Sequence, residues 1–400
     1  MNQIRKNSLF TEDDVVHSID KTNSTHYPII FGSNYDVKIG CLIEHLHPFD
    51  TSKWSKVASF IQESLNHNID YIEPVQPISN DELRLVHSEQ FIRNIRSRRN
   101  LVHTSECFIL YFLPFNWIDQ RIIRPLRFQT SGTIMAACWS YQNHLSSINL
   151  GGGFHHCTAN RSAGFCFFAD ITLAIRNIWS ACVADDRPLM PILIVDCDAH
   201  QGNGYERDVL AMTNDEKKLI YILDMFNPLI YPRDEMAKKA INREIHIGYR
   251  TNDENYIKLL DFHLNAIIES DHFKPGLIIY NAGTDCLQGD RLGRLNITAK
   301  GIIKRDETMF RFGSRNKVAI VMLLSELSEN SCYGFYTLDG YNITRTRRPI
   351  AFGGRFLWNL ARTAPELPCA RVTLPQMTRN LLNFPGRFGT GLLLFSVIKK

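Results

Sequence analysis

Several features that would define a class of protein are missing from this sequence. No stretch approaches the ~20 consecutive apolar residues that a membrane-spanning helix needs. The start of the chain, from Met1 to Ser8, has no apolar core and continues into an acidic run, so we expect no signal peptide. The ten cysteines match neither a disulfide framework nor a CxxC zinc site. These absences favour an intracellular protein with reduced thiols.

A dominant charge of one sign is also missing. The formal net charge is only +4 over 400 residues, and it is unevenly spread. Residues 345–400 hold ten Lys and Arg against one acidic residue, Glu366, and carry +9, which leaves −5 for residues 1–344. The mildly acidic body gives no general signal for polyanion binding, so we expect no sequence-specific nucleic-acid binding. The basic tail could contact nucleic acid or acidic lipid, or it could be a solvated chain end.

Apolar residues are abundant and arranged in short runs. They make up 44% of the chain, and charged residues make up 22%, which is typical of a globular protein with a sizeable core. Most of the β-rich runs are nearly continuous rather than alternating, which predicts strands buried on both faces of a parallel sheet. These runs cover residues 27–31, 147–150, 192–195, 219–223, 244–247, 277–280 and 318–324.

Helical patterns lie between the predicted strands. Apolar residues at positions 171, 175, 178 and 182 recur at helical spacing, and Asp170 is placed to cap the start of that helix. Further helices are predicted over residues 256–267 and 299–312. Strands alternating with helices predict an α/β fold with a parallel sheet, in which ligands bind beyond the carboxyl ends of the strands. We interpret residues 1–26 as a polar N-terminal arm and residues 27–325 as one domain without internal repeats.

Three of the predicted strand ends are unusually rich in polar groups. Each group of side chains directly follows a buried apolar run. The groups are Gly151-Gly152-Gly153 with His155 and His156, then Asp196, Asp198 and His200, and finally Asp285. The second group alternates by two residues, so its members share one face if the chain is extended there.

Two carboxylates and one imidazole would suit a catalytic metal. A catalytic zinc site keeps three protein ligands and one open position for water, and a nearby histidine can then move protons. Blander interpretations remain open for each group taken alone. The paired histidines could be hydrogen-bonded structural residues, and the Asp-x-Asp-x-His segment could be a turn or a helix cap. The glycines could suggest phosphate binding, although GxGxxG and a P-loop lysine are absent. The three groups together favour a metal hydrolase.

The same segments resemble a known family. Residues 151–157, 196–204 and 281–293 look like the signature segments of class IV histone deacetylases, within the arginase/deacetylase superfamily. Flanking pieces at 46–50, 129–133, 164–166 and 230–232 are similar too. The resemblance covers about 27–325 and 340–351, so residues 27–351 are identified as a histone deacetylase-like catalytic domain. It implies a three-layer α/β fold with a central, mostly parallel sheet of about eight strands flanked by helices.

The resemblance also implies the metal ligands. Zinc would be held by Asp198, His200 and Asp285. Asp196 and Asp198 would in addition border a structural potassium ion.

Catalytic and channel roles follow from the same resemblance. His156 would be the general base and acid, and His155 would stabilise charge with Asp196 as its carboxylate partner. Gly164, Phe165 and Tyr231 would bind substrate, with the two aromatic rings as walls of a narrow tube for the lysine side chain. Ordinary core packing is the alternative role for those rings.

Three features distinguish this chain from many deacetylases. Asn203 stands where many members have Asp. Class IV members resemble this chain in having Asn at this position. The family places an oxyanion-donating tyrosine shortly after the last predicted strand, but here residues 326–339 intervene between Ser325 and Tyr341, our candidate for that donor. Residues 352–400 form an atypical basic tail that resembles nothing in the family.

The expected activity is zinc-dependent hydrolysis of N6-acyl-lysine, acetyl or long-chain fatty acyl, on histones or other proteins. Alternatives are an amidohydrolase acting on acetylpolyamines or other small amides, and a catalytically impaired zinc-binding scaffold. The resemblance implies corepressor or other deacetylase complexes as partners, and location in the nucleus or cytoplasm.

Overall fold

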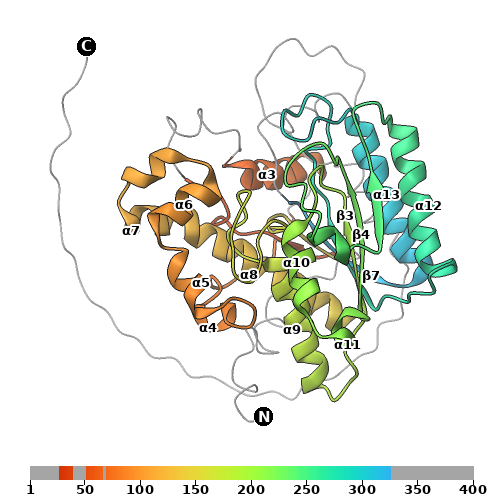
Figure 1. The fold of residues 1–400 in the computed structure, drawn as a ribbon, viewed down its shortest axis with the longest axis horizontal. Helices are drawn as coiled ribbons and strands as arrows, with labels where there is room; N and C mark the ends of the chain where they lie inside the picture. The colour runs from red at the N-terminus through yellow and green to blue at the C-terminus, as the bar shows by residue number, and fades with distance from the viewer. Residues whose placement is uncertain (1–26, 39–50, 66–68, 326–400) are drawn as a thin grey trace. The chain divides into compact units, whose positions relative to one another are not determined.

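A parallel β-sheet organises the computed structural model, which describes residues 27–38, 51–65 and 69–325. Its strand order is β1-β2-β7-β6-β3-β4-β5, and every neighbouring pair is parallel. Figure 1 labels β3, β4 and β7 of this sheet. The strands are β1 (Ile29–Ile30), β2 (Ser147–Asn149), β3 (Ile192–Asp196), β4 (Ile220–Phe226), β5 (Arg243–His246), β6 (Leu277–Asn281) and β7 (Ala319–Leu323). All seven apolar runs of the sequence became strands, so the predicted α/β class is confirmed.

Helices connect successive strands. The long ones are α3 (Lys53–Leu65), α8 (Arg124–Asn143), α9 (Asp170–Ala184), α10 (Asn203–Ala211), α12 (Asp253–Glu269) and α13 (Ala299–Asn316). The short ones are α4 (Asn80–Leu83), α5 (Glu89–Asn94), α6 (Arg98–Ser105), α7 (Phe115–Ile118) and α11 (Asn214–Lys217), with the 3₁₀ helices η2 (Phe108–Phe112) and η4 (Ala237–Ala240) and the π-helix η3 (Asp119–Ile123). The helices predicted over 171–182, 256–267 and 299–312 correspond to α9, α12 and α13.

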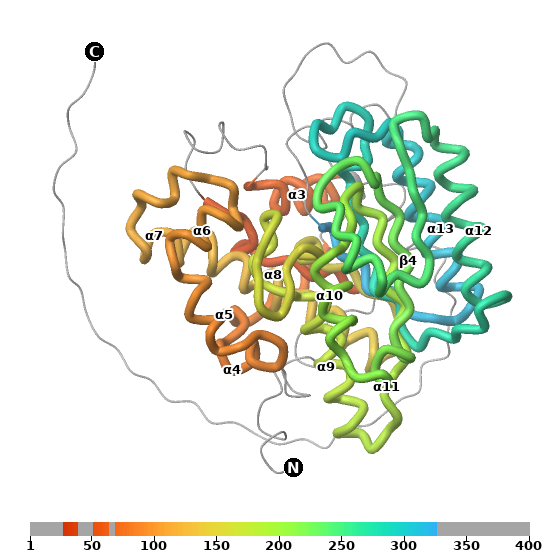
Figure 2. The backbone as a smooth tube through the Cα atoms, in the orientation of Figure 1, coloured from red at the N-terminus to blue at the C-terminus, as the bar shows by residue number. Residues whose placement is uncertain are grey.

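The central strands are apolar on both faces because a helical layer covers each face. Alternate residues of β3, such as Leu193 and Val195, pack in one core with residues of α12 and α13. Their neighbours Ile192 and Ile194 pack in a second core with residues of α8 and α9. Figure 2 shows α12 and α13 side by side along one side of the sheet. Helix, sheet and helix thus form the three layers that the resemblance implied.

The capping role predicted for Asp170 is wrong. Ala169 occupies the N-cap of α9, and Asp170 is the first helical residue. Its buried carboxylate instead accepts hydrogen bonds from the backbone of Gly153 (2.7 Å) and Phe154 (2.8 Å) and from the Thr133 hydroxyl (2.7 Å). The carboxylate therefore anchors the glycine turn after β2, a long-range contact that helical periodicity cannot reveal.

A buried histidine ties the segment after that turn to the helical layer. The Nε2 atom of His87 accepts from the Ala169 backbone N–H (3.1 Å), so Nδ1 carries the proton and donates to the Ala159 carbonyl (3.0 Å). The ring also stacks on Phe91 at 4.2 Å. Burial lowers the pKa of His87 from 6.5 to about 4, and the hydrogen bond to Ala159 opposes this only in part.

Replacing His87 with Phe should lower stability by ~1–3 kcal/mol near neutral pH, because two buried backbone groups lose their partner. In the native chain, His87 stays neutral between pH 6.5 and 4 while the unfolded chain takes up a proton. Its contribution is therefore complete above pH 6.5 and falls by up to about 3 kcal/mol as the pH drops toward 4. Urea unfolding at pH 7.5 and 5 should show that the native chain and the variant differ less in free energy of unfolding at the lower pH. The exposed His103→Gln is the control, and a pH-independent gap for His87→Phe would contradict this explanation.

No helix in the described ranges combines the length and the apolar character that crossing a bilayer requires.

Candidate metal centre and active site

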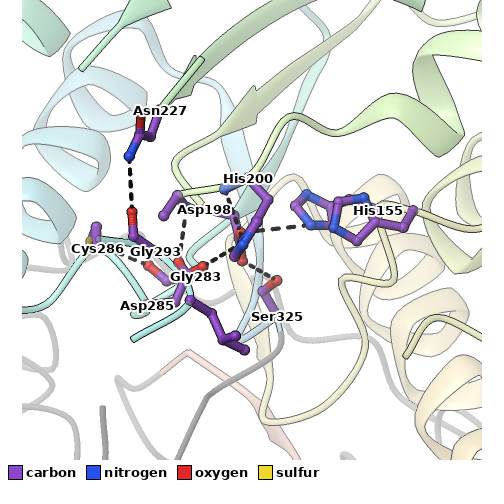
Figure 3. Close-up of polar contacts among 12 residues, drawn as sticks. His155, Asp198, His200, Asn227, Gly283, Asp285, Cys286, Gly293 and Ser325 are labelled. Atoms are coloured by element: carbon purple, nitrogen blue, oxygen red, sulfur yellow. Dashed lines mark hydrogen bonds and ion pairs between the residues drawn. The ribbon is translucent and has the colours of Figure 1, made fainter. Parts of the chain in front are cut away.

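The structure brings the three polar strand ends together at one edge of the sheet. β2, β3 and β6 are all parallel, so the segments that follow them emerge on the same side. Asp198 and His200 follow β3, and Asp285 follows β6. One ligand atom from each of these three residues lies within 4.8 Å of the other two. The His200 Nδ1 atom is 2.7 Å from Asp285 Oδ2 and 3.2 Å from Asp198 Oδ1 (Figure 3).

Electrostatics at this cluster favour a cation. Burial opposes the charge on Asp198, but the adjacent His155 and His200 outweigh it and lower the pKa of that carboxyl. Burial and then the charge of Asp198 raise the pKa of Asp285 to about 7. Burial opposes a charge on His200 as well, yet the two carboxylates raise its pKa well above the usual value. A proton on His200 thus balances two crowded carboxylates, and a divalent cation held by the same atoms would do so more directly.

Close packing fixes the two carboxylate ligands. The Ala199 backbone N–H donates to Asp285 Oδ1 (2.8 Å), and the Ser325 hydroxyl donates to Asp198 Oδ2 (2.9 Å). Gly283 passes so near that a Cβ atom there would lie 2.3 Å from the same Asp198 oxygen, so only glycine fits. Two carboxylates and one imidazole, held rigidly at this spacing, form a donor set that fits zinc with an open position for water.

The tandem histidines lie beside this cluster. Their ring centroids are 4.0 Å apart, and both rings are buried. The His155 Nδ1 atom is 2.9 Å from Asp196 Oδ2, and its Nε2 atom is 3.6 Å from Asp198 Oδ1. Asp196, predicted as the partner of His155, is therefore in place to fix that ring.

His156 has an amide partner instead of a carboxylate. Its Nδ1 atom lies 2.8 Å from Asn203 Oδ1, so Nδ1 donates and Nε2 is left without the proton. The His156 ring also faces the His200 ring edge-on at 5.9 Å. Burial, and then the nearby His155 and His200, lower the pKa of His156 well below its usual value. A neutral imidazole with a free Nε2 lone pair is the form that a general base requires.

Two of the predicted channel residues, Gly164 and Tyr231, lie against His156. The Tyr231 ring packs edge-on against the His156 ring at 5.0 Å and is 46% exposed. Gly164 approaches so closely that a Cβ atom would meet His156 Cδ2 at 2.5 Å, and its φ of +49° also favours glycine. Phe165 follows in the chain, and its backbone N–H donates to the Thr104 carbonyl at 2.8 Å.

A hollow of about 690 Å³ opens from these residues. His156, Asn203 and Tyr231 line it on one side, and Arg161 and Arg233 contribute to its rim. His156, one of the tandem histidines, is thus reachable from a surface depression.

Some predicted residues lie outside the described ranges. They are the segment 46–50, the insertion 326–339, the candidate oxyanion donor Tyr341 and the tail 352–400. The proposed N-terminal arm, residues 1–26, also falls outside them.

Sequence reasoning missed several supporting contacts. The Asn281 amide donates to Asp196 Oδ1 (3.1 Å), and the buried Lys53 ammonium donates to the Ser325 carbonyl (2.7 Å). Asn281 stood within the third motif, where its position at a strand end was a usable signal. Lys53 gave no signal, because a lysine on a helix is usually solvated.

A second group of buried carboxylates lies near Asp196. Glu206 and Asp224 are fully buried, and burial followed by the charges of Asp196 and Glu206 raises the pKa of Asp224 well above its usual value. Burial also raises the pKa of Glu206 to about 7. This group accompanies Asp196 at the place where the resemblance implied a structural cation.

Comparisons with known proteins agree with this geometry. A family model described as "Histone deacetylase domain" matches residues 47–325. The chain is 40% identical over 298 residues to Histone deacetylase 2 of Arabidopsis thaliana, covering 74% of this chain and 73% of that protein. It is 26% identical over 237 residues to human Histone deacetylase 1, covering 56% of this chain and 46% of that protein.

Solved structures share the fold. A histone deacetylase homologue complexed with SAHA superposes with a TM-score of 0.53 at 16% identity, over 74% of this chain and 79% of that one. The HDA15 HD domain superposes with a TM-score of 0.54 at 16% identity, over 76% of this chain and 85% of that one. The family match extends over more than half of the sequence and includes every strand end that carries the metal cluster and the tandem histidines. The chain therefore belongs to the histone deacetylase family.

Proposed function

We propose that this chain is a zinc-dependent lysine deacylase that hydrolyses the amide of N6-acyl-lysine. The observation that carries the proposal is the convergence of Asp198, His200 and Asp285 beside the buried pair His155 and His156. A cation site at one edge of a sheet, beside a neutral base that lines a hollow, suits amide hydrolysis by activated water.

The metal ligands would be Asp198, His200 and Asp285. Zinc bound there would polarise the acyl carbonyl and lower the pKa of its water to about 7. The Ser325 hydroxyl and the Ala199 N–H would hold the two carboxylates in place.

The two histidines would divide the proton transfers. The Nε2 atom of His156 would take a proton from the attacking water, since Nδ1 is committed to Asn203. As the C–N bond breaks, the same nitrogen would return the proton to the leaving lysine amine, so that lysine and a carboxylate are released. His155, paired with Asp196, would stabilise negative charge that develops on the substrate oxygen.

Further roles complete the proposal, and one of them falls on Tyr341, outside the described residues. Tyr341 would donate a hydrogen bond to the oxyanion, by continuity of 341–351 with the family pattern. Gly164, Phe165 and Tyr231 would surround the methylenes of the lysine side chain. A potassium ion near Asp196 and Asp198 would favour the ionised forms of Glu206 and Asp224, whose pKa values burial raises.

The finer assignment is to class IV, with acetyl and longer fatty acyl groups as substrates on histones or other proteins. Supporting it are the Asn203 position and the three signature segments. We place the protein in the nucleus or cytoplasm, within deacetylase complexes, and we treat 27–351 as the catalytic domain.

Turnover of acetyl- and myristoyl-lysine peptides by the purified 400-residue chain tests this function. We expect product formation that stops on chelation, returns with zinc and is strongly reduced in Tyr341→Phe. A second version, with residues 326–339 replaced by one glycine, shows whether that segment affects the activity. Zinc binding without turnover in either version would favour a scaffold, and turnover of free acetylpolyamines alone would favour a small-amide hydrolase.

Asn203→Asp should move the acidic limb of the kcat/KM profile to higher pH. A carboxylate beside Nδ1 stabilises the protonated His156 ring, whose pKa therefore rises. The base works only when neutral, so activity begins at a higher pH than in the native chain. Profiles from pH 5 to 9 on one acyl-lysine peptide measure the shift. An unmoved acidic limb would show that His156 does not control it.

A further inference from the structure

An exposed cluster of aromatic rings lies outside the three hydrophobic cores. It lies on η2, where Phe108, Tyr111 and Phe112 are 66%, 44% and 69% exposed. The three rings contact one another, with centroid distances of 5.4 to 6.2 Å. Ile109 in the same turn is also exposed. Single exposed apolar residues are ordinary, but a contiguous aromatic cluster on one turn marks a surface that meets something apolar.

Arginines frame this cluster. Arg98 of α6 lies over the Tyr111 ring at 5.8 Å and donates to the Tyr111 and Leu113 carbonyls. Arg96 lies over Phe115 at 5.5 Å. These two guanidinium groups thus help to fix the aromatic segment. Arg96, Arg98 and the neighbouring Arg99 of α6 are all exposed to solvent.

The local charge is strongly positive although the body of the chain is acidic. Residues 93–127 contain seven arginines against two acidic residues, Glu106 and Asp119, a formal net charge of +5. Residues 1–344 as a whole carry −5. Positive charge is therefore concentrated in the segment of the chain that contains the turn with the exposed rings.

We propose that the surface formed by Phe108, Tyr111, Phe112, Arg96, Arg98 and Arg99 docks on a membrane containing anionic lipids. Aromatic rings prefer the headgroup region of a bilayer, where their apolar bodies and polar edges are both accommodated. Arginines beside them bind lipid phosphates and follow the negative surface potential. The rings project from a short turn, a shape that inserts shallowly between headgroups.

This surface is linked to the rim of the active site. Thr104, at the end of α6, accepts from the backbone N–H of Phe165 (2.8 Å), and its hydroxyl is 2.6 Å from that of Ser162. Phe108 follows Thr104 by four residues. Docking would hold the hollow over His156 near the lipid surface. The docking does not depend on the proposed deacylase function. The two would be connected only if the acyl chain of a substrate also lies in that membrane.

Vesicle sedimentation of the full chain tests the docking. We expect binding to phosphatidylcholine vesicles that contain phosphatidylserine, little binding to pure phosphatidylcholine, and release as salt is raised. Phe108→Ser with Phe112→Ser should weaken binding at least about tenfold. Arg96→Gln with Arg99→Gln should weaken it about 25-fold, roughly fivefold for each arginine.

The matched control changes equally exposed apolar residues elsewhere. Phe262 on α12 and Val183 on α9 are 64% and 63% exposed, and both helices lie away from α6 and α7 in Figure 1. Phe262→Ser with Val183→Ser should bind like the native chain. The melting temperature of each variant is measured as well, and a native-like value shows that weaker binding is not caused by unfolding.

Several results would overturn the proposal. Equal binding by the native chain and both surface variants would assign lipid binding to the basic residues 345–400 or another region. Absence of vesicle binding by the native chain would reject it outright. Retention on polyglutamate, sensitive to the same substitutions while vesicles are ignored, would identify an acidic protein partner instead.

Discussion

Asp198→Asn should abolish zinc binding and reduce deacylation to background. The substitution keeps the shape of the side chain but removes the anionic oxygen that lies 3.2 Å from His200 Nδ1. Groups that merely support a metal ligand typically change affinity ~10–100-fold, so loss of a ligand should cost more than about 100-fold. Metal content measured by mass spectrometry, together with melting in the presence and absence of zinc, provides the readout.

Asp208→Asn is the matched control for that variant. Asp208 is also a buried carboxyl, and burial raises its pKa to about 6. The neutral amide that replaces it therefore resembles the protonated carboxyl, a form that Asp208 adopts in part. It accepts from Ala159 N–H and the Thr172 hydroxyl, away from the metal cluster. We expect slightly lower stability with full zinc content. An Asp198→Asn protein that still binds one zinc per chain tightly would disprove the proposed ligand set.

His156→Ala should lower kcat by ~10²–10⁴ while zinc content stays unchanged. The ring supplies Nε2 for proton transfer but offers no ligand atom to the cluster of Asp198, His200 and Asp285. Because His156 lines the hollow of about 690 Å³, free imidazole can reach the space left by the ring. Added imidazole should therefore restore part of the rate.

The control for that variant is His263→Gln, a partly exposed residue of α12 outside the site. Single-turnover rates on an acetyl-lysine peptide distinguish the chemical step from product release. If His156→Ala keeps the native kcat with a full complement of zinc, the base is a different group and the division of roles between the two histidines is incorrect.

Periodicity in the sequence determined the layers. The seven predicted runs became seven strands. A strand covered on both faces is apolar at nearly every position, as Ile192 to Val195 are, whereas the edge strand β5 buries only Ile245. The stripes at 171–182, 256–267 and 299–312 became α9, α12 and α13 because one helix face packs against the sheet. Strand order was not visible in either pattern, since parallel neighbours such as β3 and β6 are distant in the chain.

The sequence also indicated which residues would meet. Parallel strands place their carboxyl ends at one edge, so the sequence alone was enough to group Asp198, His200 and Asp285. Their chemistry as a set, rather than that of any one residue, pointed to a metal. The family resemblance then suggested separate roles for His155 and His156.

Only the tertiary structure decided how these side chains are held. Asp170 looked like a helix cap but binds the glycine turn, and Lys53 looked like a solvated lysine but is buried against the Ser325 carbonyl. His87 showed no pattern at all, yet it fixes the backbone at Ala159 and Ala169. Such contacts join residues that are far apart in sequence, and their energies depend on burial, which exists only once the layers have packed. Local periodicity reports which face of an element is apolar, whereas the partner of a buried polar group is set by the whole fold.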